Sequence, residues 1–562
     1  MANVLNGRIL KLALPNILSN LTIPLLGMVD LALSGHLRDA YAIGGIAIAS
    51  TLFSLIYWNF SFLRMGTTGL TAQAHGRGDK IEMGRNLMQS LFIAITSSVL
   101  VLSLQYPLLG VILSIMSPEP ALISYATTYY NIVIWGAPAM LCTYALNGWL
   151  IGMQNTWCPM VVSIVTNITN IVISASLVLI WGRGIEGIAI GTLSAQWIGV
   201  IALGIGVYYL FLKRGAVYLP NRFRDLKIGL RRYFGTNIHI FFRTMLLALI
   251  SAFFTYSGTQ QGALTLAANA LLYQFFNFFS YFIDGFAFAA EALVGHFYGM
   301  KERQLLRSSI RTLIVWGFGI AVATSLVYML VSSPFLHILT DKEEVIVYAQ
   351  NYLPWVFIIP FTGFLAFLFD GVFVGVTATK EMFVSMFIAV LVFFALYYLL
   401  PLSDQNHILW ASFVTYLAIR GSMQVLIARR LKGIGLPFEY IYYLSIGSTF
   451  LDREPEIRRQ IIKKFPKGEF SSFYSTPDAS GKSDKVYLNS VFRIESELSL
   501  EEVIACAKRM EEDAGRDRSS QEVTLDVDVV MQDAHVLRER DFRHDYFQYG
   551  YKELITYEQA ND

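Results

Sequence analysis

Four acidic residues stand inside apolar stretches of this sequence: Asp30, Asp284, Glu291 and Asp370. A charged side chain at the centre of a membrane helix costs roughly 2.5 to 3.5 kcal/mol on insertion scales, so such residues usually mark an ion or substrate pathway. Asp30, in the run GMVDLALSG, is the strongest candidate for a functional acid. The alternative is a protonated or hydrogen-bonded carboxyl that serves only packing.

The other three acids have both a functional and a structural interpretation. Asp284 and Glu291 are seven residues apart, so they lie on one face of a helix. Arg243 is a buried cation that could form a structural ion pair with one of them instead of leaving it for ion coupling. Asp370 precedes Gly371 in a small-residue pattern that lets helices approach closely, so it is a candidate for coupling or for packing.

The composition places most of the chain in a membrane. Of 562 residues, 55% are hydrophobic and 15% charged, whereas soluble domains carry about 25% charged residues. The 84 charged residues are 43 basic and 41 acidic, a balance that excludes a typical nucleic-acid binder. They concentrate after residue 450, so a polar domain follows an apolar one. Three scattered cysteines exclude a disulfide framework and a thiolate metal site.

Twelve stretches are long and apolar enough to span a bilayer, which takes about 20 residues. The first lacks a small-residue cleavage site and is too long for a removable signal peptide. The expected spans lie near 12–33, 42–62, 87–109, 125–151, 159–181, 187–212, 236–256, 266–289, 312–333, 351–376, 382–400 and 408–427.

Basic residues concentrate in alternate loops, which include the stretch 213–232 and, on this reading, Arg64. The opposite loops hold only Arg38, Arg183 and Lys342. Because cytoplasmic loops carry the excess of Lys and Arg, we expect a multi-pass protein of the cell (inner) membrane with both termini in the cytoplasm.

The two halves repeat with a constant offset of 223 residues, which predicts two parallel six-helix bundles that bind substrate at their interface. The repeat mate of Asp30 is Phe253, so the charge of Asp30 is not needed to build a bundle. The expected domains are an N-terminal lobe (1–212), a basic connector (213–235), a C-terminal lobe (236–432), a linker (433–440) and a cytoplasmic domain (441–562). The matching positions are Ser34-Gly35 with Ser257-Gly258, Gly76 with Gly299, Asn147-Gly148 with Asp370-Gly371, and Gly152 with Gly375.

Five segments of the apolar region closely resemble the multidrug and toxic compound extrusion (MATE) family, in its DinF-like branch. The resemblance covers residues 8–430 and implies a twelve-helix antiporter that exports organic, often cationic, compounds in exchange for protons or sodium. The segments are LALPNILSNLTIPLLGMVDLALSGHL, FLRMGTTGLTAQAHG, NGWLIGMQ, IDGFAFAAEALVG and FDGVFVG.

The family resemblance also implies roles for individual residues. Asp30 matches the aspartate that takes the coupling ion, Asn170 and Thr192 match polar residues beside it, and Pro15 matches a proline about which the first helix bends. Relatives carry an aspartate four residues after the asparagine, where this chain has Ser174. A lone carboxylate can bind a proton but is a poor sodium site without further oxygens, so we expect proton coupling.

The last 120 residues alternate strand and helix patterns in the β-α-β-β-α-β order of an α+β ferredoxin-like domain. The expected elements are 441–447, 452–464, 469–474, 487–495, 500–513 and 523–531. In TLDVDVV, Asp526 and Asp528 project from one face of a strand and could hold Mg²⁺ against phosphate oxygens.

This domain resembles hydroxymethyldihydropterin pyrophosphokinase, which transfers pyrophosphate from ATP to a pterin, through YLSIGSTFLDRE, SSFYSTP, VYLNSVFRIE and GRDR. The resemblance implies that Asp526 and Asp528 bind magnesium. It also places a pterin-like pocket at Thr476, Pro477, Tyr487 and Asn489. However, Val523 stands where a phosphate-holding arginine is expected, and the segment SSQEV is shortened. We expect a degenerate domain that retains at most Mg²⁺ and ATP or pterin binding.

The sequence therefore predicts a secondary antiporter that works as a monomer and needs no cofactor for transport. Its expected partners are a small-molecule cargo, protons or sodium, and the bilayer, with no nucleic acid. Two alternatives stay open: a flippase for lipid-linked precursors, and a membrane-attached folate-pathway pyrophosphokinase.

Overall fold

The computed structural model describes two compact units, Met1–Ile434 and Gly435–Asp562. The described residues are 2–35, 40–116, 119–220, 227–400, 404–429, 431, 440–466, 468–478, 485–496, 498, 500–516, 522–533 and 535–561. Within these ranges the side chains of residues 2–3, 23–32, 34–35, 40, 42, 112, 115–116, 121 and 557–561 are not described.

The first unit is built of helices, and ten helical segments of its described residues are long and apolar enough to cross a membrane. Helix α1 and the pair α6–α7 occupy the two other expected places, and the number of twelve spans stays a prediction. The helices are α1 (Ala2–Gly35), α2 (Ala40–Asn59), α3 (Phe62–Arg77), α4 (Lys80–Ser103), α5 (Gln105–Met116), α6 (Pro120–Val133), α7 (Ala137–Gly152), α8 (Trp157–Ala175), α9 (Ile185–Val207), α10 (Leu230–Gln260), α11 (Ala263–Gly299), α12 (Arg303–Leu339), α13 (Glu343–Gln350), α14 (Leu353–Gly375), α15 (Thr379–Leu399) and α16 (Gln405–Ala428).

The second span is longer than the sequence predicted. A short turn at residues 60–61 joins α2 to α3, and one span continues from Ile43 to Arg77. Arg64 lies inside α3, about 20 Å before the helix end at a rise of about 1.5 Å per residue. The expectation of Arg64 in a cytoplasmic loop is therefore wrong, because the turn at residues 60–61 interrupts the helix without ending the span.

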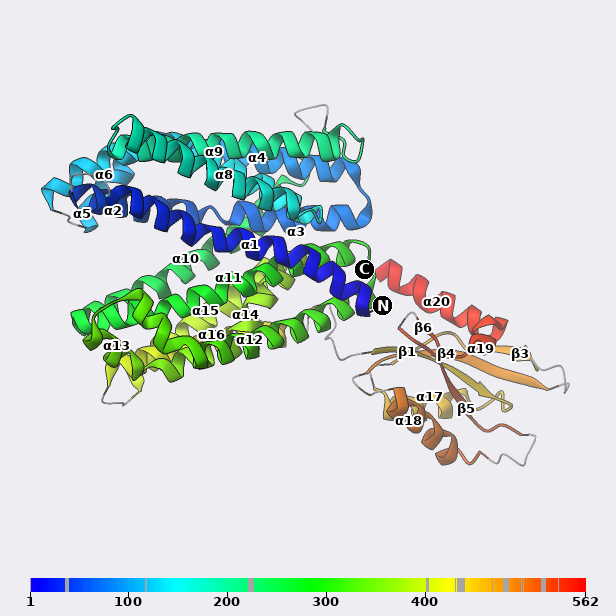
Figure 1. Cartoon of the computed structure of the whole chain (residues 1–562). Helices are drawn as coiled ribbons and strands as arrows, with labels where there is room; N and C mark the ends of the chain where they lie inside the picture. The colour runs from blue at the N-terminus through cyan, green and yellow to red at the C-terminus, as the bar shows by residue number, and fades with distance from the viewer. Residues whose placement is uncertain are drawn as a thin grey trace. The chain divides into compact units, whose positions relative to one another are not determined.

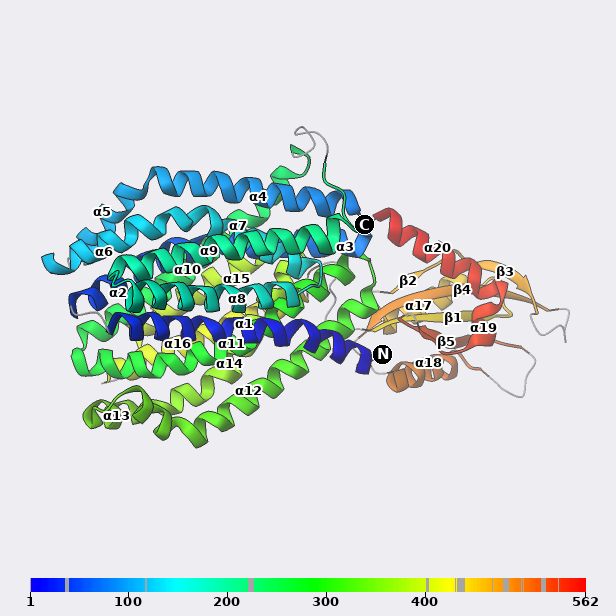
Figure 2. The same cartoon turned by 45° about the horizontal axis from the view of Figure 1, so that its top comes forward.

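The 223-residue offset recurs in the helix bounds. Helices α4 and α12 begin at Lys80 and Arg303, and helices α7 and α14 end at Gly152 and Gly375. Figure 1 shows the two resulting bundles, α1–α9 and α10–α16, which diverge toward α5, α6 and α13 and come together near the end of α3. We call them the N-terminal bundle and the C-terminal bundle. Figure 2 shows the same helices from a second direction.

Glycines allow α3 and α11 to cross where the bundles meet. A Cβ atom at Gly76 would lie 2.0 Å from the carbonyl oxygen of His296, and one at Gly299 would lie 2.2 Å from that of Gln73. The two contacts correspond to each other under the 223-residue repeat. The crossing is therefore locally twofold symmetric, with a glycine of each helix against the backbone of the other. Helix α14 approaches α11 as closely, since a Cβ at Gly371 would lie 2.2 Å from the carbonyl oxygen of Ala287.

The second unit has a ferredoxin-like sheet. Its strands are β1 (Tyr440–Ser448), β2 (Glu469–Phe470), β3 (Tyr474–Pro477), β4 (Val486–Ser496), β5 (Asp526–Gln532) and β6 (His535–Val536), in the order β2-β4-β1-β5-β6, with β3 on β4. All pairs are antiparallel. Helices α17 (Glu454–Lys464) and α18 (Leu500–Asp513) cover one face.

The opposite face of this sheet carries α20 (Asp545–Asn561), which follows the short helix α19 (Glu539–Arg543) and which the sequence did not predict. Phe547 and Leu554 of α20 pack on Ile441, Tyr443 and Val491, residues that alternate with those facing α17 and α18. The sheet thus has an apolar core on both faces, which is sufficient for a domain of this size to fold alone.

We expect Gly371→Ala to destabilise the C-terminal bundle by about 1 to 3 kcal/mol, because its Cβ would displace backbone of α11. Gly319→Ala in α12 is the matched control, since a Cβ there meets no atom within 4 Å and alanine favours the helix. Thermal unfolding of the purified full chain measures the difference. Equal melting temperatures for the two variants would contradict the close crossing.

Candidate functional site

A buried polar cluster joins α8 and α9 in the N-terminal bundle. The Asn170 amide donates to the Thr192 hydroxyl at 3.2 Å, and the Ser174 hydroxyl donates to Asn170 Oδ1 at 3.3 Å. Tyr129 Oη lies 3.4 Å from Thr192 Oγ1. The structure thus brings together Asn170 and Thr192, which are 22 residues apart in the sequence, and adds Ser174 and Tyr129 to them.

A cavity of about 260 Å³ extends from this cluster between α7, α8 and α9. Asn147, the repeat mate of Asp370, lies on its wall, and its Oδ1 is buried without a partner among the described residues. The polar lining is neutral, so the cavity suits hydrogen-bonding groups and water. It comprises Asn147, Thr143, Ser163, Thr166, Asn167, Asn170, Thr192 and Gln196 together with apolar residues.

Helix α1 packs on α8 and also contacts α9, the two helices that carry this cluster. Asp30 belongs to α1, but its side chain lies outside the described residues. Pro15 is buried within the same helix. The first half of α1, including Ala13 and Ile17, packs on α11 of the C-terminal bundle, so α1 contacts both bundles. A bend at Pro15 stays a prediction.

In the C-terminal bundle, Asp370 is neutralised by two arginines. Arg243 from α10 and Arg420 from α16 both donate to Asp370 Oδ2, and Gln424 donates to Oδ1 at 2.6 Å. All four side chains are buried. Arg243 therefore pairs with Asp370 and not, as one interpretation of the sequence had it, with Asp284 or Glu291. A carboxylate held by two guanidinium groups is unsuited to bind a further cation.

Glu291 is paired across the bundles. Arg64 of α3 contacts it with both prongs of the guanidinium, at 3.0 Å from Nη1 to Oε2 and 3.3 Å from Nη2 to Oε1. Sequence reasoning missed Arg64 because it placed this residue in a loop. The signal was available: reading 43–77 as one span leaves an arginine near its middle, which demands a buried partner.

Asp284 differs from the other acids of the C-terminal bundle. It is half-buried on α11, two turns before Glu291, and within the described part of the chain it makes no hydrogen bond or ion pair. Arg64 and Arg243 act on it only through longer-range electrostatics. Of the three acids that the sequence singled out here, Asp284 alone retains an unengaged carboxyl among the described contacts.

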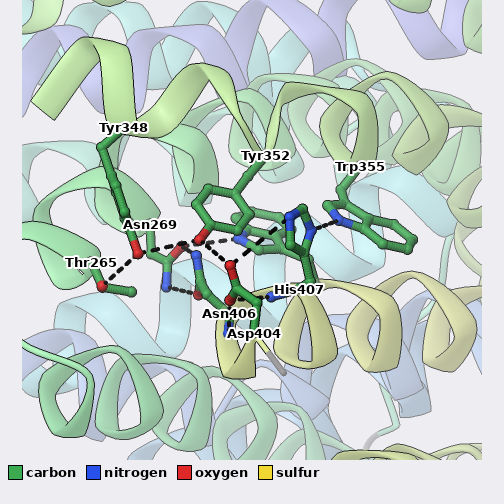
Figure 3. Close-up of polar contacts among 9 residues, drawn as sticks. Thr265, Asn269, Tyr348, Tyr352, Trp355, Asp404, Asn406 and His407 are labelled. Carbon is green, nitrogen blue, oxygen red and sulfur yellow. Dashed lines mark hydrogen bonds and ion pairs between the residues drawn. The ribbon is translucent and has the colours of Figure 1, made fainter. Parts of the chain in front are cut away.

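The far end of the C-terminal bundle is tied by a hydrogen-bonded network from α11, α13, α14 and α16 (Figure 3). The amides of Asn269 and Asn406 bond to each other at 2.7 and 3.1 Å. Tyr352 donates to Asp404 at 3.0 Å, and the Trp355 indole donates to His407 Nδ1 at 3.0 Å. These contacts stay within one bundle, so they hold its helices together as a body.

In the second unit, the sheet brings Asp526 and Asp528 beside Glu511 of α18. One oxygen from each lies within 4.8 Å of the others. The two aspartates point to one side of β5, as predicted, because they are two residues apart on a strand. Glu511 also accepts the Val527 amide at 3.0 Å, and it was not predicted, since it lies in a helix far from the motif.

Arginines already form ion pairs with these carboxylates. Arg516 binds Asp526 and lies 3.0 Å from Glu511, and Arg538 lies 2.6 Å from Asp528. Burial raises the pKa of Asp528, and the charge of Asp526 raises it further, whereas Arg538 lowers it. Burial likewise raises the pKa of Glu511. The two guanidinium groups offset these shifts only in part, so the pKa values of Asp528 and Glu511 both stay raised.

The acid set fits a magnesium ion in its donors, since Mg²⁺ prefers carboxylate oxygens. When bound, the ion would be held by Glu511, Asp526 and Asp528 and would screen phosphate charge beside them. Arg516 and Arg538 would have to release the acids first. They line, with Lys508, a cavity of about 530 Å³ where Val523 contributes no charge.

A second cavity, of about 270 Å³, shares Asp526 and Asp528 with the first. All four residues of the expected pterin-like pocket, Thr476, Pro477, Tyr487 and Asn489, line it. The Asn489 amide donates to Thr476 Oγ1 at 2.8 Å, because β3 and β4 pair in this register. The lining also includes four residues that were not predicted as part of this pocket: Arg540, Asp541, His544 and Tyr546.

The first unit is similar in sequence to a known protein family. The MatE family model matches residues 15–175 and 240–399. DNA damage-inducible protein F of Escherichia coli is 34% identical over 419 residues, which cover 75% of this chain and 91% of that protein. Multidrug resistance protein MdtK of Edwardsiella ictaluri is 23% identical over 419 residues, covering 71% and 88%.

Solved structures share the fold. The eukaryotic MATE transporter AtDTX14 superposes with a TM-score of 0.69 at 16% identity, covering 77% of this chain and 97% of its own. A point mutant of the Vibrio cholerae MATE transporter VcmN gives a TM-score of 0.68 at 18% identity, covering 77% and 99%. In the second unit, residues 443–554 match the family model of 7,8-dihydro-6-hydroxymethylpterin-pyrophosphokinase.

We expect the double variant Arg516→Ala, Arg538→Ala of the isolated second unit to bind Mg²⁺ roughly tenfold more tightly than the unaltered domain, since displacing partly buried guanidinium groups opposes the ion. Isothermal titration with MgCl₂ measures this. Arg543→Ala is the control, because Arg543 is exposed and pairs only with Glu539 among the described residues. Unchanged affinity in the double variant would show that the arginines do not compete with metal.

Proposed function

Because this chain belongs to the MATE family of multi-pass membrane transporters, we propose that it exports organic, cationic or amphipathic compounds in exchange for protons. In this proposal both termini are cytoplasmic, the protein works as a monomer in the inner membrane, and helix α1 bends about Pro15 during transport. The lobes are 1–212 and 236–432, joined by the connector 213–235. The linker 433–440 leads to a cytoplasmic domain, 441–562.

The observation that carries the proposal is the hydrogen-bonded pair Asn170–Thr192. It lies on α8 and α9, beside the helix that bears Asp30, in a wall of neutral groups. A single carboxylate among neutral hydrogen-bonding groups can take up a proton, because the protonated form is uncharged in an apolar surrounding. Asp30 is thus the proposed coupling group, with Asn170 and Thr192 as its neighbours.

The hydrogen bonds that the oxygens of this cluster already make favour proton coupling over sodium coupling. The Thr192 hydroxyl donates to the Ile188 carbonyl while it accepts from Asn170, and the Asn170 oxygen accepts from Ser174. A hard cation requires several oxygens at once, and these are engaged with one another. Asp370 is unsuited to replace them because two arginines bind it.

For the cytoplasmic domain we propose ligand binding without pyrophosphoryl transfer. Its two cavities meet at Asp526 and Asp528, an arrangement that supports binding of Mg²⁺ with ATP or of a pterin-like ring. The cation missing at Val523 argues against turnover, because phosphoryl transfer depends on positioned charge. Neither pocket belongs to the helices of the transport unit.

Asp30→Asn should reduce gradient-driven export to background, because an amide cannot exchange a proton, while folded protein remains in the membrane. Export from proteoliposomes under an imposed pH gradient measures this. Glu186→Gln, which alters only an exposed ion pair, is the control and should export normally. Undiminished coupled export by Asp30→Asn would remove Asp30 from the mechanism.

Export should follow an imposed pH gradient and stay unchanged when sodium is replaced by choline, because the oxygens of Asn170 and Thr192 are already engaged in hydrogen bonds. The test uses the unaltered full chain in proteoliposomes with each gradient imposed separately. A strict sodium requirement would refute proton coupling. It would direct attention to Asp284, the unengaged acid of the C-terminal bundle.

The isolated domain, residues 436–562, should fold but release no appreciable AMP from ATP and hydroxymethyldihydropterin. Loss of one positioned cation typically costs about 3 kcal/mol in such a transition state, or about a hundredfold in rate. Deleting the domain should leave export largely intact, since the transport repeat ends before residue 434. Robust AMP release that Asp526→Ala abolishes would make the chain a bifunctional transporter and enzyme.

A further inference from the structure

An ion pair joins the two bundles at the crossing of α3 and α11. The guanidinium of Arg64 meets both carboxylate oxygens of Glu291, and its plane lies over the Phe288 ring at 4.0 Å from the centroid. Arginine suits this position because its fork matches a carboxylate and its flat face stacks on an aromatic ring. The Arg64 side chain is 16% exposed and that of Glu291 is 2% exposed.

The helix crossing does not require this charge pair. In the repeat, Arg64 corresponds to Ala287 and Glu291 corresponds to Thr68. The twofold-equivalent place therefore holds an alanine and a threonine, although the glycine contacts within each bundle match: Gly148 lies against the Arg64 backbone in the N-terminal bundle and Gly371 against the Ala287 backbone in the C-terminal bundle. The fold builds this contact once with charges and once without them.

The other hydrogen bonds described between α3 and the C-terminal bundle have a neutral group on at least one side. Gln73 donates to the Gly375 carbonyl at 2.8 Å and accepts from the Arg232 guanidinium at 2.7 Å, and the hydroxyls of Thr67 and Tyr233 lie 2.6 Å apart. Water can replace such bonds at little cost. An ion pair in a dry interface behaves differently, because removing one partner leaves an uncompensated buried charge. Its strength therefore depends on whether water reaches the crossing.

We propose that Arg64 and Glu291 form a latch that holds the two bundles together where α3 lies against α11 and that must open in each transport cycle. The proposal rests on the proposed function, since export by parallel repeats requires the bundles to part alternately at each face. When α3 and α11 separate, water hydrates both groups. The latch is thus strong while the crossing is dry and weak once it opens.

The hydrogen-bonded network of Figure 3 helps to explain why the latch lies between the bundles at Arg64 and Glu291. It ties α11, α14 and α16 at the far end within one bundle, and Asp370 ties α10, α14 and α16 in the same bundle. The C-terminal bundle can therefore move as one body. The Arg64–Glu291 pair lies between the bodies, where breaking a contact changes their separation.

The test measures the distance between the bundles by pulsed electron resonance on the full chain. Spin labels replace Ile81 of the N-terminal bundle and Met300 of the C-terminal bundle, both exposed (54% and 43%), after Cys142, Cys158 and Cys506 are changed to serine. We expect one short distance for the latched protein. Glu291→Gln should add a longer distance, with the ratio of long to short rising roughly tenfold.

Two further variants keep the result interpretable. The charge swap Arg64→Glu, Glu291→Arg should restore the short distance, which a merely structural defect would not allow. Glu186→Gln removes a charge from an exposed pair within one bundle and should change nothing. Only samples that elute as a single species are compared.

An unchanged distance distribution in Glu291→Gln would overturn the latch, as would a swap that stays open. If Glu291→Gln does not fold, the swap alone decides, because it retains both charges. The measurement needs neither a gradient nor a known cargo. Failure of proton-driven export in the wild-type chain would therefore refute the proposed function while leaving the latch to be judged by distance alone.

Discussion

The cost of placing a charge in an apolar medium shapes the transport unit. The two fully buried acids described in the C-terminal bundle are each paired with arginine: Asp370 with Arg243 and Arg420, and Glu291 with Arg64. These residues come from five different helices, so satisfying their charges fixes how the helices lie. Unpairing any one of them would leave a charge that neither lipid nor protein can solvate.

This constraint separates the two bundles chemically. The cavity of the N-terminal bundle is lined by amides and hydroxyls, whereas the equivalent region of the C-terminal bundle holds an acid and two arginines. Asn147 and Asp370 are repeat mates at the same helix ends, yet one is neutral with an unpartnered oxygen among the described residues and the other is bound by cations. One scaffold thus holds a neutral polar cavity in one bundle and an ion-paired cluster in the other.

Much of this architecture can be read from the sequence because it depends on local pattern. Apolar runs of sufficient length predict spans, the constant offset predicts the repeat, and period-two alternation places Asp526 and Asp528 on one side of a strand. The family resemblance predicted that Asn170 and Thr192 both lie beside Asp30, and therefore near each other. The prediction was wrong at Arg64, because the sequence at the short turn between α2 and α3 resembles the end of a span.

Only the tertiary structure decided which charges meet. Arg243 has three acids within reach in the sequence, and nothing in their spacing selects Asp370. The partner of Glu291 is 227 residues away in the other bundle, and Glu511 joins the aspartates of β5 from a separate helix. Coulomb attraction acts through space over a few ångströms, whereas sequence pattern reports only which face of its own helix or strand a side chain occupies.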